Sequence, residues 1–199
     1  MLAIPNYEPT FFDKADTFFQ VFGDELSKII GCTLEDYWLM WDKKDDVWFS
    51  DGPVILKIAN RQFEFTAFDE EFSLTLNEID LNQDLEWYGT EENNLLVWNS
   101  KSNADINNLI GRKITDINII AYNNISEVIF DKVNPENVGR IIETGFILHG
   151  IEFEFEKSHL FDNNNHLQIF NAINENGIRT TKQEVDKQYQ KITILKSAN

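Results

Sequence analysis

The sequence predicts an α+β fold in which an N-terminal helix packs on a mostly antiparallel β-sheet, either whole or divided into two weakly related β-lobes. Two patterns lead to this prediction. Apolar residues recur at helical spacing over residues 13–30, and from residue 54 onward they mostly alternate with polar residues, as in strands. A hydrophobic content of 42%, with 16 phenylalanines, is sufficient for a sizeable core.

The chain length of 199 residues fits a single domain. A division into an acidic, Trp-rich lobe over residues 1–100 and a nearly neutral lobe over residues 101–199 is compatible with it. Residues 54–80 and 146–174 resemble each other weakly in the order of their apolar runs. A duplication would explain this resemblance, and so would the general similarity of antiparallel meanders.

The first predicted element is a helix from Asp13 to Ile30, because its apolar residues recur every three or four positions. Gly31 suits the end of this helix. Gly23 weakens its middle, so two shorter helices are the alternative. The next segment, residues 33–42, fits either a short helix or a strand.

The remaining elements are mostly strands separated by polar segments. The polar residues 99–108 fit either a lobe boundary or a short helix, a turn is predicted at Asn134–Asn137, and a capping-box pattern predicts a helical turn at Thr181–Glu184. The predicted strands are residues 54–58, 62–68, 72–76, 95–98, 114–122, 127–130, 146–148, 151–156, 167–170 and 188–195.

The charge is concentrated in one half of the chain, whose net charge is −17. Residues 1–100 carry 21 acids and 6 bases, whereas residues 101–199 carry 13 acids and 11 bases. Between Arg61 and Lys101 there are ten acids and no base. Such a surface repels nucleic acid and attracts basic molecules, so nucleic-acid binding is excluded and a basic protein partner is expected.

The predicted binding site for that partner centres on Trp87 and Tyr88, which lie within the acidic run. Aromatic rings flanked by carboxylates bind Arg and Lys through cation–π contact and charge. The alternative is that these rings pack back onto the core. The predicted protein-binding residues are Glu86, Trp87, Tyr88, Glu91, Glu92, Glu70 and Glu71.

An alternative use of the same region is a metal site. The oxygen ligands from Asp80 to Glu91 have the spacing of a twelve-residue calcium loop. However, Leu85 stands where that loop needs a glycine, so we interpret the segment as a solvated acidic loop and predict no metal or other cofactor. The residues of the alternative metal site are Asp80, Asn82, Asp84, Glu86 and Glu91.

A second group of carboxylates lies at Glu152, Glu154 and Glu156, alternating with Phe153 and Phe155. A strand would place the three carboxylates on one face and the two rings on the other. We interpret that acidic face as solvent-exposed, because the carboxylate pair of a glycosidase comes from facing elements.

No catalytic residue is predicted. His149, His159 and His166 lack the usual spacing of a zinc site, and there is no nucleophile motif. The single cysteine, Cys32, excludes an internal disulfide and is expected to pack as a small apolar residue. The first residues show no leader pattern and no run approaches the ~20 apolar residues of a membrane span, so a cytoplasmic protein without membrane contact is expected.

The function expected from these observations is that of a non-catalytic acidic binding protein. By analogy of composition, it would be an immunity-type inhibitor that neutralises a basic protein such as a bacterial toxin nuclease. One alternative is an enzyme or metal-dependent module that uses the carboxylate clusters. Another is a structural domain that forms a homo-oligomer through the balanced C-terminal half.

Overall fold

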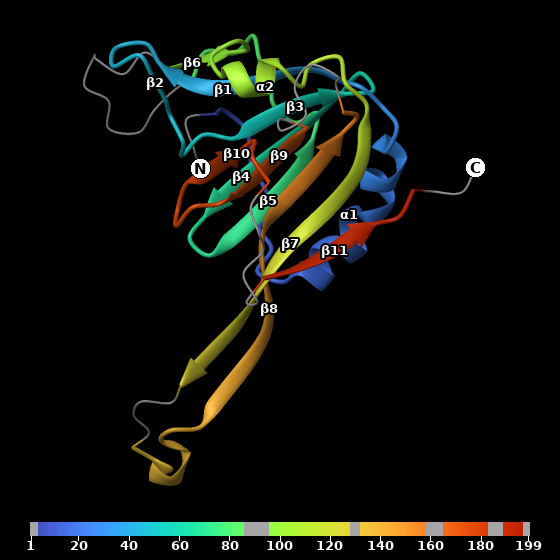
Figure 1. Cartoon of the computed structure of the whole chain (residues 1–199). Helices are drawn as coiled ribbons and strands as arrows, with labels where there is room; N and C mark the ends of the chain where they lie inside the picture. Colours follow the sequence, from blue (N-terminus) through green and yellow to red (C-terminus); the bar gives the residue numbers. More distant parts are fainter. Residues whose placement is uncertain (1–3, 86–95, 128–131, 158–164, 183–188, 197–199) are drawn as a thin grey trace.

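The computed structural model describes residues 4–85, 96–127, 132–157, 165–182 and 189–196. One long helix and two antiparallel sheets surround a shared hydrophobic core (Figure 1). The predicted α+β class, with two β-lobes and an N-terminal helix, is confirmed. Within the described residues, no helix is long and apolar enough to cross a membrane.

The N-terminal helix α1 (Ala15–Ile29) follows the predicted range closely. Its apolar face is buried at Phe18, Leu26 and Ile29, which accounts for the helical spacing in the sequence. The helix continues through Gly23, so the alternative of two shorter helices is wrong. Gly31 has a φ of +91°, the left-handed conformation expected of a residue that ends a helix.

The first sheet has the order β2-β1-β3-β4-β5, with β6 also paired to β1. Its formation resolves residues 33–42 as a strand, and the predicted hairpin around residue 60 is confirmed with Ala59 and Asn60 as a two-residue turn. Its strands are β1 (Leu34–Asp42), β2 (Val47–Trp48), β3 (Val54–Ile58), β4 (Arg61–Phe68), β5 (Glu71–Leu76) and β6 (Leu96–Asn99). A single helical turn, α2 (Ala104–Asn107), follows, so the polar segment contains the short helix.

The second sheet has the order β10-β9-β8-β7-β11. Its strands are β7 (Ile114–Glu127), β8 (Ile141–Phe155), β9 (His166–Asn171), β10 (Asn176–Arg179) and β11 (Tyr189–Ile194). The sequence predicted two separate strands in the range now covered by β8. It also ended the first strand of β7 at residue 122, and residues 128–130 of the next predicted strand lie outside the described residues. Bulges between β7 and β8 shift the alternation of apolar residues, so each continuous strand looks interrupted in the sequence.

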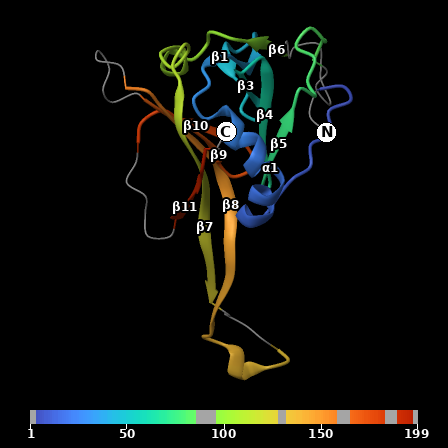
Figure 2. The same ribbon diagram turned by 90° about the vertical axis from the view of Figure 1, so that its right-hand side faces the viewer.

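The hairpin formed by β7 and β8 projects from the rest of the molecule as an arm (Figures 1 and 2). Strand β11 accompanies β7 only as far as Tyr122, and β9 accompanies β8 only from Gly150 onward. Beyond those residues the arm is a two-stranded ribbon whose described end carries the 3-10 turn η1 (Pro135–Asn137).

The shared core lies between the inner faces of the two sheets and α1. Phe65 of the first sheet contacts Phe153 of the second edge to face at 5.9 Å, and Phe18 of α1 lies 6.3 Å from Phe72. Residues from both halves of the chain therefore bury one another. The weakly similar segments 54–80 and 146–174 differ in structure, since the first contains a three-stranded meander and the second begins within one continuous strand.

Candidate functional site

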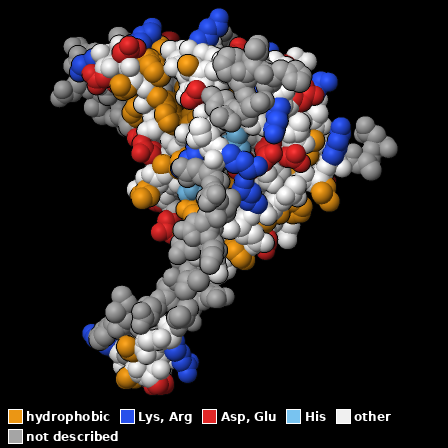
Figure 3. Space-filling view, in the orientation of Figure 1, with side chains coloured by type: hydrophobic (Ala, Val, Ile, Leu, Met, Phe, Trp, Pro, Cys, Tyr) orange, Lys and Arg blue, Asp and Glu red, His pale blue; other side chains and the backbone are white. Residues whose placement is uncertain are grey.

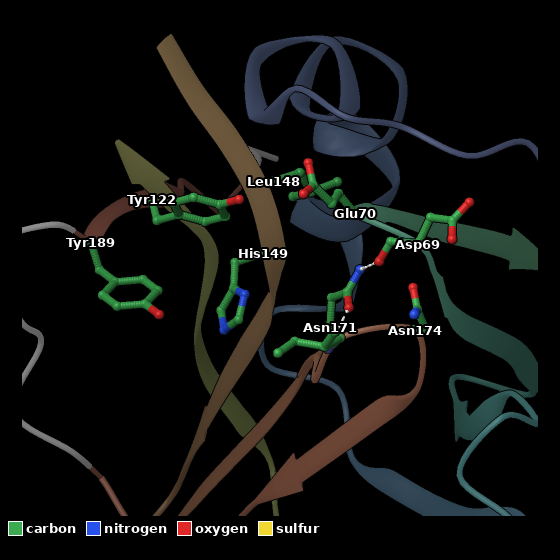
Figure 4. A pocket seen from close by; sticks show the side chains of 9 residues that line it. Asp69, Glu70, Tyr122, Leu148, His149, Asn171, Asn174 and Tyr189 are labelled. Carbon is green, nitrogen blue, oxygen red and sulfur yellow. Dashed lines mark hydrogen bonds between the residues drawn. The ribbon is translucent and has the colours of Figure 1, made fainter. Parts of the chain in front are cut away.

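A cavity of about 750 Å³ lies where two hairpin turns, one from each sheet, meet the base of the arm (Figure 4). Figure 4 shows the rings of Tyr122, His149 and Tyr189 on one side of it and polar side chains on the other. The residues that line the cavity are Asp69, Glu70, Tyr122, Leu148, His149, Asn171, Ile173, Asn174 and Tyr189.

Asn171 joins the two sheets at this cavity. Its side-chain Nδ2 donates to the carbonyl oxygens of Asp69 at 2.8 Å and Glu71 at 3.0 Å, and its Oδ1 accepts from the backbone N–H of Ile173 at 3.0 Å. One amide therefore fixes the β4–β5 turn relative to the β9–β10 turn. Because Asn171 is buried, these hydrogen bonds give the cavity a rigid floor.

A continuous group of rings forms the opposite wall. His149 lies 6.1 Å from Tyr122, 5.3 Å from Tyr189 and 5.3 Å from Phe170, measured between ring centroids. Burial, and secondarily the charge of Arg179, lowers the pKa of His149 to about 4. The imidazole is therefore uncharged at neutral pH and adds no positive charge to this wall.

The acidic side of the cavity is Asp69 and Glu70, in the turn between β4 and β5. Burial raises the pKa of Tyr122, and the negative charge of Glu70 raises it further. The Glu70 carboxylate therefore acts electrostatically on the Tyr122 ring. A cation in the cavity would meet the carboxylates and the faces of the rings together.

A β-bulge places His149 in this wall. Leu148 pairs with Ala121 and Gly150 pairs with Ile120, so β8 has one extra residue, His149, between these pairs. Leu148 belongs to the shared core, whereas His149 contacts Phe170 and the tyrosines at the base of the arm. Bulges commonly redirect one side chain in this way at functional sites.

The β9–β10 turn contributes an unusual residue to the rim of the cavity. Ile173 has a φ of 64° and Asn174 a φ of 71°, and the backbone N–H of Ala172 donates to the carbonyl of Glu175 at 2.8 Å. These are features of a tight hairpin turn that favours Asn and Gly. A β-branched residue is strained in this conformation. Burial in the core does not compensate for the strain, because Ile173 is 86% exposed.

A buried ion-pair network lies on the second sheet around Glu152, which is 3% exposed. Lys191 Nζ contacts its two carboxylate oxygens at 2.5 and 2.7 Å, His166 Nε2 lies 3.1 Å from Oε2, and Asn118 Nδ2 donates to Oε1 at 3.1 Å. Burial alone would raise the pKa of Glu152, but the hydrogen bonds and charges of His166 and Lys191 together lower it to about 2.

This network corrects the interpretation of the alternating carboxylates. Phe153 and Phe155 are buried in the core, as the alternation predicts, so the three glutamates do share the other face. That face is not uniformly exposed to solvent, however. Glu152 is buried, Glu154 is half-buried and Glu156 is exposed.

Glu152, Glu154 and His166 are the one group in the described part of the chain whose ligand atoms are close enough for a metal ion, all within 4.8 Å. Two lysines already provide positive charge there. Lys191 binds Glu152, and Lys182 Nζ binds Glu154 at 2.7 Å. Basic and acidic side chains lie next to one another on the face drawn in Figure 3. We therefore interpret this group as an internal ion-pair network.

The predicted site residues fall into three groups in the structure. Glu86, Trp87, Tyr88, Glu91 and Glu92 lie outside the described residues. Glu70 lines the cavity, whereas Glu71 does not line it and contributes its backbone carbonyl to Asn171.

The described members of the alternative metal site form a short polar loop. Asp80 Oδ1 accepts from the backbone N–H of Asn82 at 2.9 Å and from its Nδ2 at 3.1 Å, and Asp84 is exposed. The carboxylate of Asp80 thus stabilises its own turn. Glu86 and Glu91 cannot be placed, because they lie outside the described residues.

The sequence did not identify the aromatic wall. Tyr122, His149 and Tyr189 come from three strands, and only the sheet order and the bulge bring them together. Ile173 could have been recognised, since Ile-Asn occupies a turn that ordinarily takes Asn-Gly. Searches against protein-family models, curated proteins and solved structures found no match to the chain.

Proposed function

We propose that this protein is a non-catalytic acidic binding protein that docks a basic protein, and that it acts as an immunity-type inhibitor of a basic toxin such as a nuclease. The observation that carries the proposal is the cavity, which places Asp69 and Glu70 opposite an uncharged aromatic wall. Acids beside aromatic rings at a concave site suit Arg and Lys side chains of a partner.

The surroundings of His149 support binding rather than catalysis. Its ring neighbours are Tyr122, Phe170 and Tyr189, and its lowered pKa keeps it a weak base at neutral pH. A general base works best when its pKa lies near the operating pH. A ring packed among rings acts instead as part of a contact surface.

The net charge of −17 supports the same function through association kinetics. A strongly negative protein attracts a basic partner from a distance, so complexes form rapidly at low salt. Rapid capture suits an inhibitor that must act before a toxin reaches its target.

Replacing Glu70 with glutamine is expected to weaken binding of the basic partner about tenfold, because the cation docked in the cavity loses one of its carboxylate partners. The partner is captured on the immobilised protein, purified, and its binding kinetics are measured at low and high salt. Glu71→Gln is the matched control, since it removes the same charge one residue away and outside the cavity lining. An acidic partner, or equal affinities for both variants and the native protein, would contradict the proposal.

The arm is the observation that supports a second candidate function, which is self-association through the C-terminal half. Within the described chain, residues 123–127 and 141–146 pair with each other and with no further strand, so the outer part of the ribbon offers backbone groups on both edges. Nearer the base, β8 is bonded to the N-terminal segment, since the N–H of Leu148 donates to the carbonyl of Asp13. An isolated ribbon of this kind is marginally stable in water. We expect sedimentation equilibrium to give twice the mass of one chain, and a single-chain mass when an Asn-Gly turn replaces residues 125–143. A monomer at every concentration excludes this candidate.

A further inference from the structure

We propose that the cavity receives one arginine side chain of the basic partner, with Ile173 covering the side chain's methylene stem. This inference rests on the proposed function and specifies the chemistry of its site. Its three parts are the charge of the cavity, the shape of its aromatic wall and the conformation of its rim.

The charge and shape of the cavity together favour arginine over lysine. A guanidinium is planar, so it can stack on a ring and donate to a carboxylate at the same time. Tyr122, His149 and Tyr189 supply ring faces, and Glu70, whose charge acts on the Tyr122 ring, supplies a carboxylate acceptor in the opposite wall beside Asp69. A lysine ammonium is a compact, strongly hydrated charge that gains less from the rings.

The chain itself already binds a guanidinium on a ring of this aromatic group. The Arg179 guanidinium carbon lies 4.8 Å from the centroid of Phe170, the ring adjacent to His149, and its Nη1 donates to Gln168 Oε1 at 3.2 Å. Stacking on a ring with a side-chain oxygen as acceptor is the same arrangement that we propose inside the cavity. There the acceptors are carboxylates, so the interaction is stronger.

The fold does not account for Ile173. Its left-handed backbone conformation favours Asn, and its side chain is 86% exposed, so neither the turn nor the core is improved by an isoleucine. Tyr189 at the same cavity is also exposed, at 38%. Apolar groups around a charged centre exclude water from a contact, as in the rim around an interface hot spot.

A titration of the full chain with two small probes tests the proposal. N-acetyl-arginine amide is expected to produce saturable NMR shifts of the His149 ring, with a Kd on the order of millimolar. N-acetyl-lysine amide should bind about fivefold more weakly, the size of one cation–π contact. Glu70→Gln should weaken the arginine probe about fivefold, whereas Glu71→Gln should bind it like the native protein. Shifts that do not saturate, or equal binding of both probes, overturn the proposal.

The role of Ile173 is tested by a matched pair of turn variants. Ala59 has a φ of 53° and occupies the equivalent position of the β3–β4 turn, remote from the cavity lining. Ile173→Asn and Ala59→Asn should both raise the urea midpoint, because asparagine suits this conformation. Only Ile173→Asn should weaken the arginine probe, by about twofold. Unchanged probe binding by Ile173→Asn overturns the assignment of Ile173 as a cover.

These measurements separate the inference from the proposed function. If a basic partner binds but the arginine probe does not, the arginine site is wrong and the docking function stands. If the arginine probe binds but no basic partner is captured, the site is supported and the proposed function fails.

Discussion

Replacing Lys191 with methionine is expected to lower the free energy of unfolding by about 3 kcal/mol at pH 7, because it leaves the buried carboxylate of Glu152 without its counter-ion. Glu152 is 3% exposed, and Lys191 Nζ lies 2.5 Å from its Oε1. Methionine retains most of the apolar stem of lysine, so the lost stability reports the charge rather than the packing. Urea denaturation measures the change.

Lys182→Met is the matched control. It removes the same charge from the neighbouring pair with Glu154, in which the lysine side chain is 63% exposed. An exposed pair contributes about 1 kcal/mol or less because water screens it. Equal losses for the two lysine variants would contradict the conclusion that burial makes the Lys191 pair important.

The pH dependence gives a second readout of the same network. The pKa of Glu152 is lowered from 4.5 to about 2, so its contribution to stability is fully present above pH 4.5 and is lost as the pH falls toward 2. In Lys191→Met, the hydrogen bond and charge of the lysine are lost while burial and the contact with His166 remain, so the pKa of Glu152 rises and protonation relieves the buried charge at a higher pH than in the native protein. The difference in stability between variant and native protein should therefore narrow below about pH 4.5. A difference independent of pH would exclude this explanation.

The helix and the hairpins of the first sheet were predictable because local patterns determine them. α1 buries one face, and the short strands from Val54 to Leu76 are separated by tight turns that stop each alternation. β8 was divided wrongly and the first strand of β7 was ended too early, since bulges such as the one at His149 shift the register within a continuous strand. A bulge depends on pairing with a distant partner strand, which periodicity in one segment does not reveal.

The candidate site was predictable only in its charge. Glu70 was found because the acidic run marks one surface, but the rings opposite it come from strands far along the chain. Alternation likewise placed Glu152 on the face opposite Phe153 without revealing what covers it. The lysine that pairs with Glu152 lies 39 residues further along the chain, on a strand that reaches it only through the sheet order.

Gly150→Ala is expected to lower the free energy of unfolding by about 3 kcal/mol, because β8 and β9 approach too closely there for a Cβ atom. A Cβ on Gly150 would lie 2.2 Å from the carbonyl oxygen of Ile169 and 2.6 Å from Cα of Phe170, so the β9 backbone would have to move. Gly111→Ala is the control. Its Cβ would meet nothing within 4 Å, and its φ of +85° should cost only about 1 kcal/mol.

Gly150→Ala also tests whether the close approach of β8 and β9 shapes the cavity. Phe170 is in register with Gly150, and its ring lies 5.3 Å from that of His149. Moving β9 away would open the aromatic wall and hydrate His149, so its pKa should rise from about 4 toward its ordinary value of 6.5. An NMR titration of the His149 ring measures this shift in the folded variant. If the variant is destabilised while the pKa of His149 is unchanged, burial of the histidine depends on the tyrosines alone, and the approach of β8 to β9 does not shape the site.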